Sequence, residues 1–262
     1  MTSALELKKF EENYDQKEVE PNYLNTSSDY FTQTRGAHRL FQAIKKFLTW
    51  PILYAKELKL SPRTVTKIAH AQGKVKVGEK LLLIPKMIFD VKELNESYDE
   101  YSVDKKNTRK QDKLTKRIVE TIADCSIFLQ LGEMLGIYAL GTIIGPAASF
   151  SGSLFLLFQN MFCLKMERED FISHKALEGK EKDNIKSNKR LTTLFYEIKN
   201  LDLIKLTKSI ISVALSIFML VEFVFAMSIL SPTILLLLST STTILAIWTH
   251  FYQESMTYPY KC

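Results

Sequence analysis

The residues best suited to chemistry are widely separated in this sequence. The four histidines are far apart and show no metal-ligand spacing; they are His38, His70, His174 and His250. The sequence contains no glycine-rich phosphate loop, dinucleotide-binding turn, nucleophile elbow or zinc-protease helix. Asp and Glu mostly alternate with Lys, which is typical of solvated helix faces. We therefore expect a protein that is not an enzyme and has no cofactor or metal.

One carboxylate lies in an unusual setting. Glu222 is inside the hydrophobic stretch that begins at Ser209. A carboxylate at bilayer depth is costly and is often functional. Two structural alternatives are that Glu222 faces another helix or lies near the membrane interface. Beyond this intramembrane polar residue the hydrophobic stretches offer no polar pathway, so a transporter has little support.

Two long uncharged blocks determine the predicted fold class. Residues 134–164 and 223–249 contain no Asp, Glu, Lys, Arg or His. Runs of about 18 or more apolar residues predict membrane spans. Each block has a proline near its middle, Pro146 and Pro232, where we expect a hairpin turn. The prediction is an all-α, multi-spanning membrane protein with helical hairpins, two to four spans and basic amphipathic cytosolic helices.

Small residues at four-residue spacing indicate where membrane helices could pack closely. Gly132 and Gly136 form one such pair, and Gly141 and Gly145 form another. The helix that leads into them has apolar residues at steps of three or four from residue 114 to residue 129. Glu120 and Asp124 lie one turn apart on a different face of that helix.

A basic amphipathic helix is predicted over residues 35–50. Its apolar side chains recur at helical spacing, and Arg, His, Gln and Lys occupy the other face. Trp50-Pro51 should end or kink it. Such a helix can lie in a membrane interface, whereas the alternative is that its stripe packs on another helix. The predicted interface residues are Leu40, Phe41, Ile44, Lys45, Lys46, Phe47, Leu48 and Trp50.

Local signals divide the region that follows. Ser61-Pro62 predicts a helix start, with Ser as the N-cap, and Pro85 should bend that helix. Residues 94–113 are polar and basic and are typical of a linker. A further helix with an apolar side is expected in the second half of residues 165–208.

These patterns give a domain organisation. We predict a polar tail (1–34), a basic amphipathic helical region (35–117), a first hydrophobic hairpin (118–164), a charged cytosolic loop (165–208), a second hydrophobic hairpin (209–252) and a short tail (253–262). The basic flanks of the hairpins place the N-terminus, the central loop and the C-terminus in the cytosol. The net charge is +6, and the basic residues flank apolar blocks. The expected partners are therefore a lipid membrane and a cytosolic protein or a second copy, rather than nucleic acid.

The order of these elements resembles two protein families. The basic helix 35–50, the segment 71–84, the helix entering the first block and Leu230-Ser231-Pro232 before the last span are similar in layout to the peroxin-eleven family. That family elongates and divides peroxisomes, which implies membrane shaping. The apolar pair 209–249, with its turn at Pro232, resembles chlamydial inclusion membrane proteins. That second resemblance implies an adaptor that recruits a host or cytosolic partner to an inclusion membrane.

Overall fold

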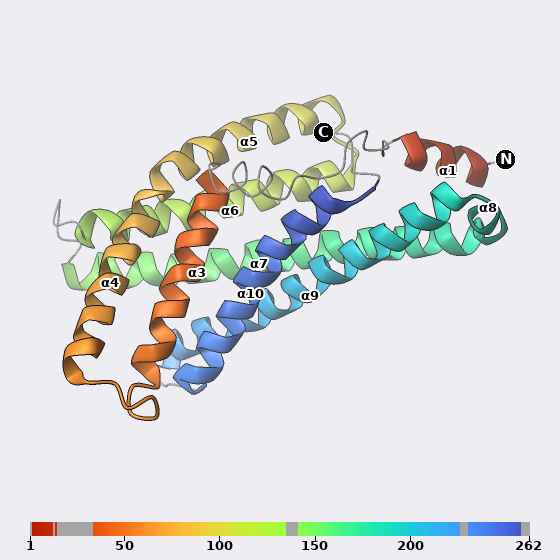
Figure 1. The fold of residues 1–262 in the computed structure, drawn as a ribbon. Helices are drawn as coiled ribbons and strands as arrows, with labels where there is room; N and C mark the ends of the chain where they lie inside the picture. Colours follow the sequence, from red (N-terminus) through yellow and green to blue (C-terminus); the bar gives the residue numbers. More distant parts are fainter. Residues whose placement is uncertain (1, 13, 15–33, 135–140, 226–229, 258–262) are drawn as a thin grey trace.

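Helices form nearly all of the computed structural model, which describes residues 2–12, 14, 34–134, 141–225 and 230–257. No strand occurs among these residues, so the predicted all-α fold is confirmed. The helices are shown in Figure 1: α1 (Thr2–Glu12), α3 (Thr34–Leu53), α4 (Pro62–Leu81), α5 (Leu83–Val103), α6 (Thr108–Met134), α7 (Gly141–Lys180), α8 (Lys182–Ser187), α9 (Lys189–Phe225) and α10 (Pro232–Ser255).

The long helices run back and forth between two ends of the molecule. We call the polar ends of α7 and α9, together with α8 (residues 165–208), the arm. The arm and α1 lie at one end of the molecule, and α4 lies at the other, as Figure 1 shows. α10 begins beside the end of α9 and finishes at the arm, where Thr257 donates its backbone N–H to Glu197. We call the opposite end, where α9 connects to α10, the turn end.

Three helices are long and apolar enough to cross a membrane. They are the described parts of α7 (Ile144–Lys180), α9 (Lys189–Phe225) and α10 (Pro232–Ser255). In each helix, only 11% of the most apolar stretch of 18 residues is buried inside the protein. Apolar surface of this extent is rarely left in contact with water, but it is the normal surface of a helix in lipid. The fold is therefore that of an all-α membrane protein.

The predicted turn at Pro146 is wrong. Pro146 lies inside α7, a few residues after its start at Gly141. As the sixth residue of α7, Pro146 removes one backbone hydrogen bond, a loss that membrane-spanning helices tolerate because neighbouring groups satisfy the freed carbonyl. α6, which ends at Met134, and α7, which begins at Gly141, pack side by side. Most of the block 134–164 consequently forms one span and not two.

The charged segment 165–208 is mostly helical, in its first half as well as in the second half where a helix was predicted. α7 continues to Lys180 and α9 starts at Lys189, so both helices extend well past the apolar region. At 1.5 Å per residue, the 40 residues of α7 measure about 60 Å, roughly twice the thickness of a bilayer core. The apolar side expected in the second half of this segment exists, since Leu191, Leu194 and Ile198 are buried.

The arm has a small hydrophobic core of its own. Phe10 of α1 stacks on Phe195 of α9, with ring centroids 5.0 Å apart, and Met256 after α10 joins the same cluster. The N-terminal segment was expected to be a polar tail, but its apolar side chains at helical spacing pack on the arm. The core residues are Leu7, Tyr14, Ile185, Leu191, Leu194, Phe195, Ile198, Leu201 and Met256.

Local sequence signals have mixed outcomes between residues 50 and 113. Ser61 caps α4, and its hydroxyl accepts the backbone N–H of Thr64 at 3.2 Å. α4 ends at Leu81 and α5 starts at Leu83, so the helix is interrupted two residues before Pro85, close to the predicted bend. α3 continues through Pro51 to Leu53. The linker expected at 94–113 is mostly helical.

Candidate membrane-binding hairpin

α3 and α4 form an antiparallel pair held together by specific contacts. Phe41 lies against Gly78, where the absence of a side chain makes room for its ring. The Lys45 ammonium pairs with the Glu79 carboxylate at 2.5 Å. Further along the pair, Gln72 donates to the Thr49 hydroxyl at 2.6 Å. We call residues 34–81 the basic hairpin.

α3 fastens the basic hairpin to the apolar helix α10. The Lys46 ammonium donates to the Ser239 carbonyl and to the Thr243 hydroxyl. Burial lowers the pKa of Lys46 to about 8, and the nearby Arg39 and Lys45 add to this effect. Closer to the turn end, the Tyr54 hydroxyl donates to Thr233 at 3.2 Å. α3 therefore lies along α10 through at least two turns.

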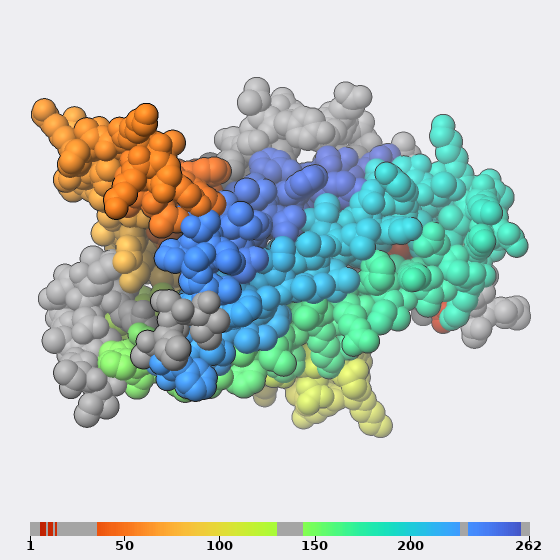
Figure 2. Space-filling view, turned by 90° about the horizontal axis from the view of Figure 1, so that it is seen from below, coloured from red at the N-terminus to blue at the C-terminus, as the bar shows by residue number. Residues whose placement is uncertain are grey.

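The outer surface of the basic hairpin combines positive charge with apolar side chains. Its 48 residues contain 11 Lys and Arg but only 2 Glu, a net charge of +9 in a chain whose total is +6. On α4 the exposed basic residues are Arg63, Lys67, Lys74 and Lys76. The exposed apolar residues are Ile44, Phe47, Leu53, Leu58, Val77 and Leu81, and Phe47 is 58% exposed. Figure 2 shows the hairpin in orange at one corner of the molecule, beside α10 in blue.

The structure divides the predicted interface residues into two groups. Phe41, Lys45 and Lys46 make contacts within the protein, as in the alternative that the helix packs on its neighbours. Ile44 and Phe47 are exposed and remain available to a membrane. The other three predicted residues are partly buried: Leu40, Leu48 and Trp50, whose ring stacks on Tyr54 at 5.6 Å.

The tip of the basic hairpin, between α3 and α4, and the arm lie at opposite ends of α10, whereas Lys46 contacts the middle of α10. Tyr54 contacts the start of α10, whereas Met256 and Thr257 after α10 belong to the arm. If α10 crosses a bilayer, these two polar regions face opposite sides of it. The sequence prediction placed residues 35–117 and 165–208 on one face. It relied on charge alone, and charge does not distinguish the ends because both are rich in Lys and Arg.

Gly78 should be a sensitive position for packing in the basic hairpin. A Cβ atom added there would lie 2.4 Å from Cε1 of Phe41, whereas one added at Gly73 would have nothing within 4 Å. Gly78→Leu should separate α4 from α3 and lower the midpoint of thermal unfolding. Gly73→Ala should instead stabilise the protein by about 1 kcal/mol, because Ala favours a helix interior. Equal effects from the two substitutions would contradict this packing.

His38 should make the stability of the basic hairpin depend on pH. Its Nδ1 lies 3.3 Å from the Glu79 carbonyl, and burial lowers its pKa from 6.5 to about 4. The folded protein therefore binds fewer protons at this site than the unfolded chain. The resulting stability is present above about pH 6.5 and is lost as the pH falls through 4. Thermal unfolding at several pH values should show a flatter profile for His38→Asn over this range; an unchanged profile would exclude His38 as its source.

The remaining predicted site residues lie at helix ends. Pro232 is the first residue of α10, with Ser231 as its N-cap, so this proline follows the second turn. Glu222 is near the end of α9 and accepts the backbone N–H of Leu230 at 3.1 Å. This carboxylate therefore caps the connection to α10 at the turn end and does not lie in the middle of the span.

Close packing at the predicted glycine pairs stays a prediction. Gly132 lies near the end of α6, Gly141 and Gly145 lie at the start of α7, and Gly136 is outside the described residues. The close approach occurs at Gly152 of α7, where an added Cβ atom would lie 3.3 Å from Cβ of Ser126. A small residue does allow α6 and α7 to approach closely, but the sequence alone did not indicate which residues of the two helices lie opposite each other.

A buried group of charges between α5 and α6 was missed from the sequence. The Lys86 ammonium contacts Asp124, and it lies 2.9 Å from Asp90 and 3.9 Å from Glu120. These three carboxylates are at most 8% exposed. Beside them, Arg117 pairs with Glu93 at 2.8 Å and with Glu120 at 2.7 Å. We call these six residues the α5–α6 charge cluster.

The position of the α5–α6 charge cluster explains its internal pairing. Ser126, two residues after Asp124, faces Gly152 in the apolar half of α7. Ionisable groups at this level should face protein and pair with each other, because lipid cannot solvate them. Oxygen atoms of the three acidic residues approach within 4.8 Å of one another, as in a metal site. The Lys86 ammonium lies among them and provides the positive charge that a metal ion would otherwise provide. The one-turn spacing of Glu120 and Asp124 was the available sequence signal, but its partner Lys86 could not be identified without the fold.

Comparisons with protein-family models, curated proteins and solved structures find no match to this chain.

Proposed function

We propose that this chain is a non-enzymatic integral membrane protein that shapes its membrane through the basic hairpin. The observation that carries the proposal is the combination of a net charge of +9 with exposed Ile44, Phe47 and Leu53 on a hairpin fastened to α10. Basic groups attract anionic lipid, and apolar side chains insert at the interface. Insertion into one leaflet beside fixed spans enlarges that leaflet and favours curvature.

The proposed orientation places the basic hairpin in the cytosol. Anionic lipids are concentrated in the cytosolic leaflet, where each Lys or Arg near the surface contributes about 1 kcal/mol. The arm would then lie on the opposite side. Burial of exposed apolar area contributes about 25 cal/mol per Å², so Phe47 should matter more than any single charge.

Reconstitution into vesicles tests this function. The full chain should tubulate vesicles that contain anionic lipid, and Phe47→Asp should abolish tubulation at every ionic strength. Val103→Asp is a matched control, because Val103 is 85% exposed but lies on α5 outside the hairpin. Lys67→Glu combined with Lys74→Glu should weaken tubulation mainly at low salt. Tubulation that survives Phe47→Asp would exclude this mechanism.

A second function is favoured by the exposed charge on α4. Arg63, Lys67, Lys74 and Lys76 could bind an acidic cytosolic protein, which would make the chain an adaptor. In that case Lys67→Glu with Lys74→Glu should abolish capture of the partner, whereas Phe47→Asp should leave capture intact. The two variants therefore separate membrane shaping from recruitment.

The two resemblances indicate a peroxisomal membrane or a bacterial inclusion membrane. Fluorescence imaging of a tagged copy distinguishes them. Membrane shaping at peroxisomes should change the length or number of these organelles when the chain is overproduced. Location on an inclusion would favour the adaptor function.

A further inference from the structure

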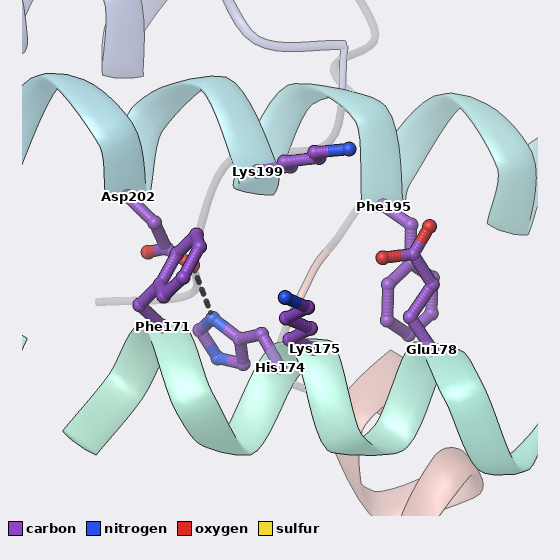
Figure 3. Close-up of a pocket in the computed structure, with 7 residues that line it drawn as sticks. All are labelled: Phe171, His174, Lys175, Glu178, Phe195, Lys199 and Asp202. Atoms are coloured by element: carbon purple, nitrogen blue, oxygen red, sulfur yellow. Dashed lines mark hydrogen bonds and ion pairs between the residues drawn. The ribbon is translucent and has the colours of Figure 1, made fainter. Parts of the chain in front are cut away.

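A small pocket in the arm lies between α7 and α9, away from the basic hairpin. Its volume is about 120 Å³. Figure 3 shows Lys175 pointing from α7 into the space between the helices, while Lys199 extends along α9 on the other side of that space. The pocket is lined by Phe171, His174, Lys175, Glu178, Phe195, Lys199 and Asp202.

The two ends of this pocket differ in chemistry. At one end His174 and Asp202 satisfy each other, with Nδ1 and Oδ2 2.7 Å apart, and Phe171 lies beside them (Figure 3). At the other end the pocket is lined by the Glu178 carboxylate of α7 and the ring of Phe195 of α9. Phe10 of α1 packs on Phe195 and on His174 and so supports the pocket from behind.

Three charged side chains of the pocket have no protein partner. Lys175, Lys199 and Glu178 form no hydrogen bond or ion pair with any residue that the structure describes. Some other charges of the arm are paired, such as Lys165 with Asp112, Lys208 with Glu167 and Lys180 with Glu6, whereas the exposed Lys182, Lys186 and Lys189 are solvated outside the pocket. Two cations and one carboxylate that share a pocket without pairing would be complemented by a ligand with two negative charges and one positive charge.

We propose that this pocket binds a small zwitterion of the phosphoethanolamine class. The phosphate would lie between Lys175 and Lys199, since lysine is a common phosphate ligand. The ammonium would lie at Glu178, against the ring of Phe195. A volume of about 120 Å³ is well below the roughly 300–1,000 Å³ of pockets for larger ligands, so it suits such a small group. This inference does not depend on membrane shaping.

The ligand could be a soluble phosphomonoester or, with one negative charge fewer, the phosphodiester head group of a lipid. Phe171 lies seven residues after Leu164, and Asp202 lies seven residues before Ser209, where the apolar stretches end and begin. At 1.5 Å per residue, the near end of the pocket is about 10 Å beyond the apolar part of each helix. Each head-group layer is only about 5–8 Å thick, so the pocket lies just outside it, where a head group would have to extend from the bilayer to reach it.

Calorimetric titration of the full chain in detergent tests the proposal. Phosphoethanolamine should bind at least tenfold more tightly than inorganic phosphate or ethanolamine. Lys175→Met and Lys199→Met should each weaken its binding by at least tenfold, whereas Glu178→Gln should weaken phosphoethanolamine and leave phosphate unchanged. Lys189→Met is the matched control, because this exposed lysine of α9 lies outside the pocket.

Several results would overturn the zwitterion site. They are equal affinity for phosphate and phosphoethanolamine, unchanged binding in both lysine variants, or an equal loss in Lys189→Met. Circular dichroism should show the same helix content in all variants, because the substituted lysines are exposed. Binding of soluble phosphoethanolamine to the chain in nanodiscs with phosphatidylethanolamine identifies the source of the ligand. Weaker binding than in detergent indicates that the lipid head group competes for the pocket, and unchanged binding indicates a soluble ligand.

Discussion

Replacing Lys86 by Met should lower the free energy of unfolding by about 3–5 kcal/mol, which is the usual cost of removing one partner of a buried ion pair. Lys86 contacts Asp124 and lies 2.9 Å from Asp90, and these carboxylates are 7% and 1% exposed. Without the ammonium, both would be left buried with reduced compensation for their charge. Chemical unfolding of the purified protein, monitored by circular dichroism, measures the change.

Two further variants show whether the loss of stability comes from the α5–α6 charge cluster or from the loss of any lysine. Lys92→Met should be nearly neutral, because the Lys92 side chain is 72% exposed and pairs only with exposed Glu96. Adding Asp124→Asn to Lys86→Met should recover part of the stability, since it removes one of the uncompensated charges. A stable Lys86→Met protein, or a double variant less stable than the single one, would show that Lys86 does not neutralise this cluster.

Ile217→Arg should prevent stable insertion of α9. Ile217 lies in the apolar half of α9 and is 44% exposed, so its side chain faces lipid when this helix spans a membrane. Arginine at the centre of a span costs about 2.5–3.5 kcal/mol on insertion scales. In cells, a large fraction of the Ile217→Arg protein should become extractable with alkaline carbonate or be degraded.

The control for this variant is Tyr196→Arg. Tyr196 lies on the same helix and is 67% exposed, but it belongs to the arm. Arginine is well solvated there, so this variant should resist carbonate as the unmodified chain does. Equal extraction of the two variants would mean that α9 has no segment at bilayer depth.

Sequence patterns were most informative where a single helix determined its own environment. The uncharged run before Thr249 was enough to predict the apolar helix α10, and the break expected at Pro232 coincides with the start of that helix. Ser61-Pro62 likewise marked the start of α4, because capping depends on neighbours in the sequence. The apolar stripe of α3 was evident, but which of its residues contact α4 depended on the position of Gly78.

The errors arose where tertiary contacts outweighed local signals. Pro146 was expected to mark a turn, yet α7 continues through it, because a membrane helix tolerates proline where neighbouring groups satisfy the freed backbone carbonyl. The charged residues of the arm were typical of a loop, but pairs such as Lys165 with Asp112 join α7 to α6 and support long helices. The pairing of Lys86 with Asp124 spans 38 residues, a separation at which sequence spacing carries no information.

Labelling of single cysteines in sealed vesicles tests most directly whether α10 crosses the membrane between two polar ends. In a chain with Cys125, Cys163 and Cys262 replaced by serine, an impermeant maleimide should label Lys67→Cys and Lys186→Cys from opposite sides. Lys67 belongs to the basic hairpin and Lys186 to α8 of the arm, and both are exposed. Ile217→Cys should remain unlabelled until detergent is added. Labelling of Lys67→Cys and Lys186→Cys from the same side, or of Ile217→Cys in intact vesicles, would contradict this arrangement.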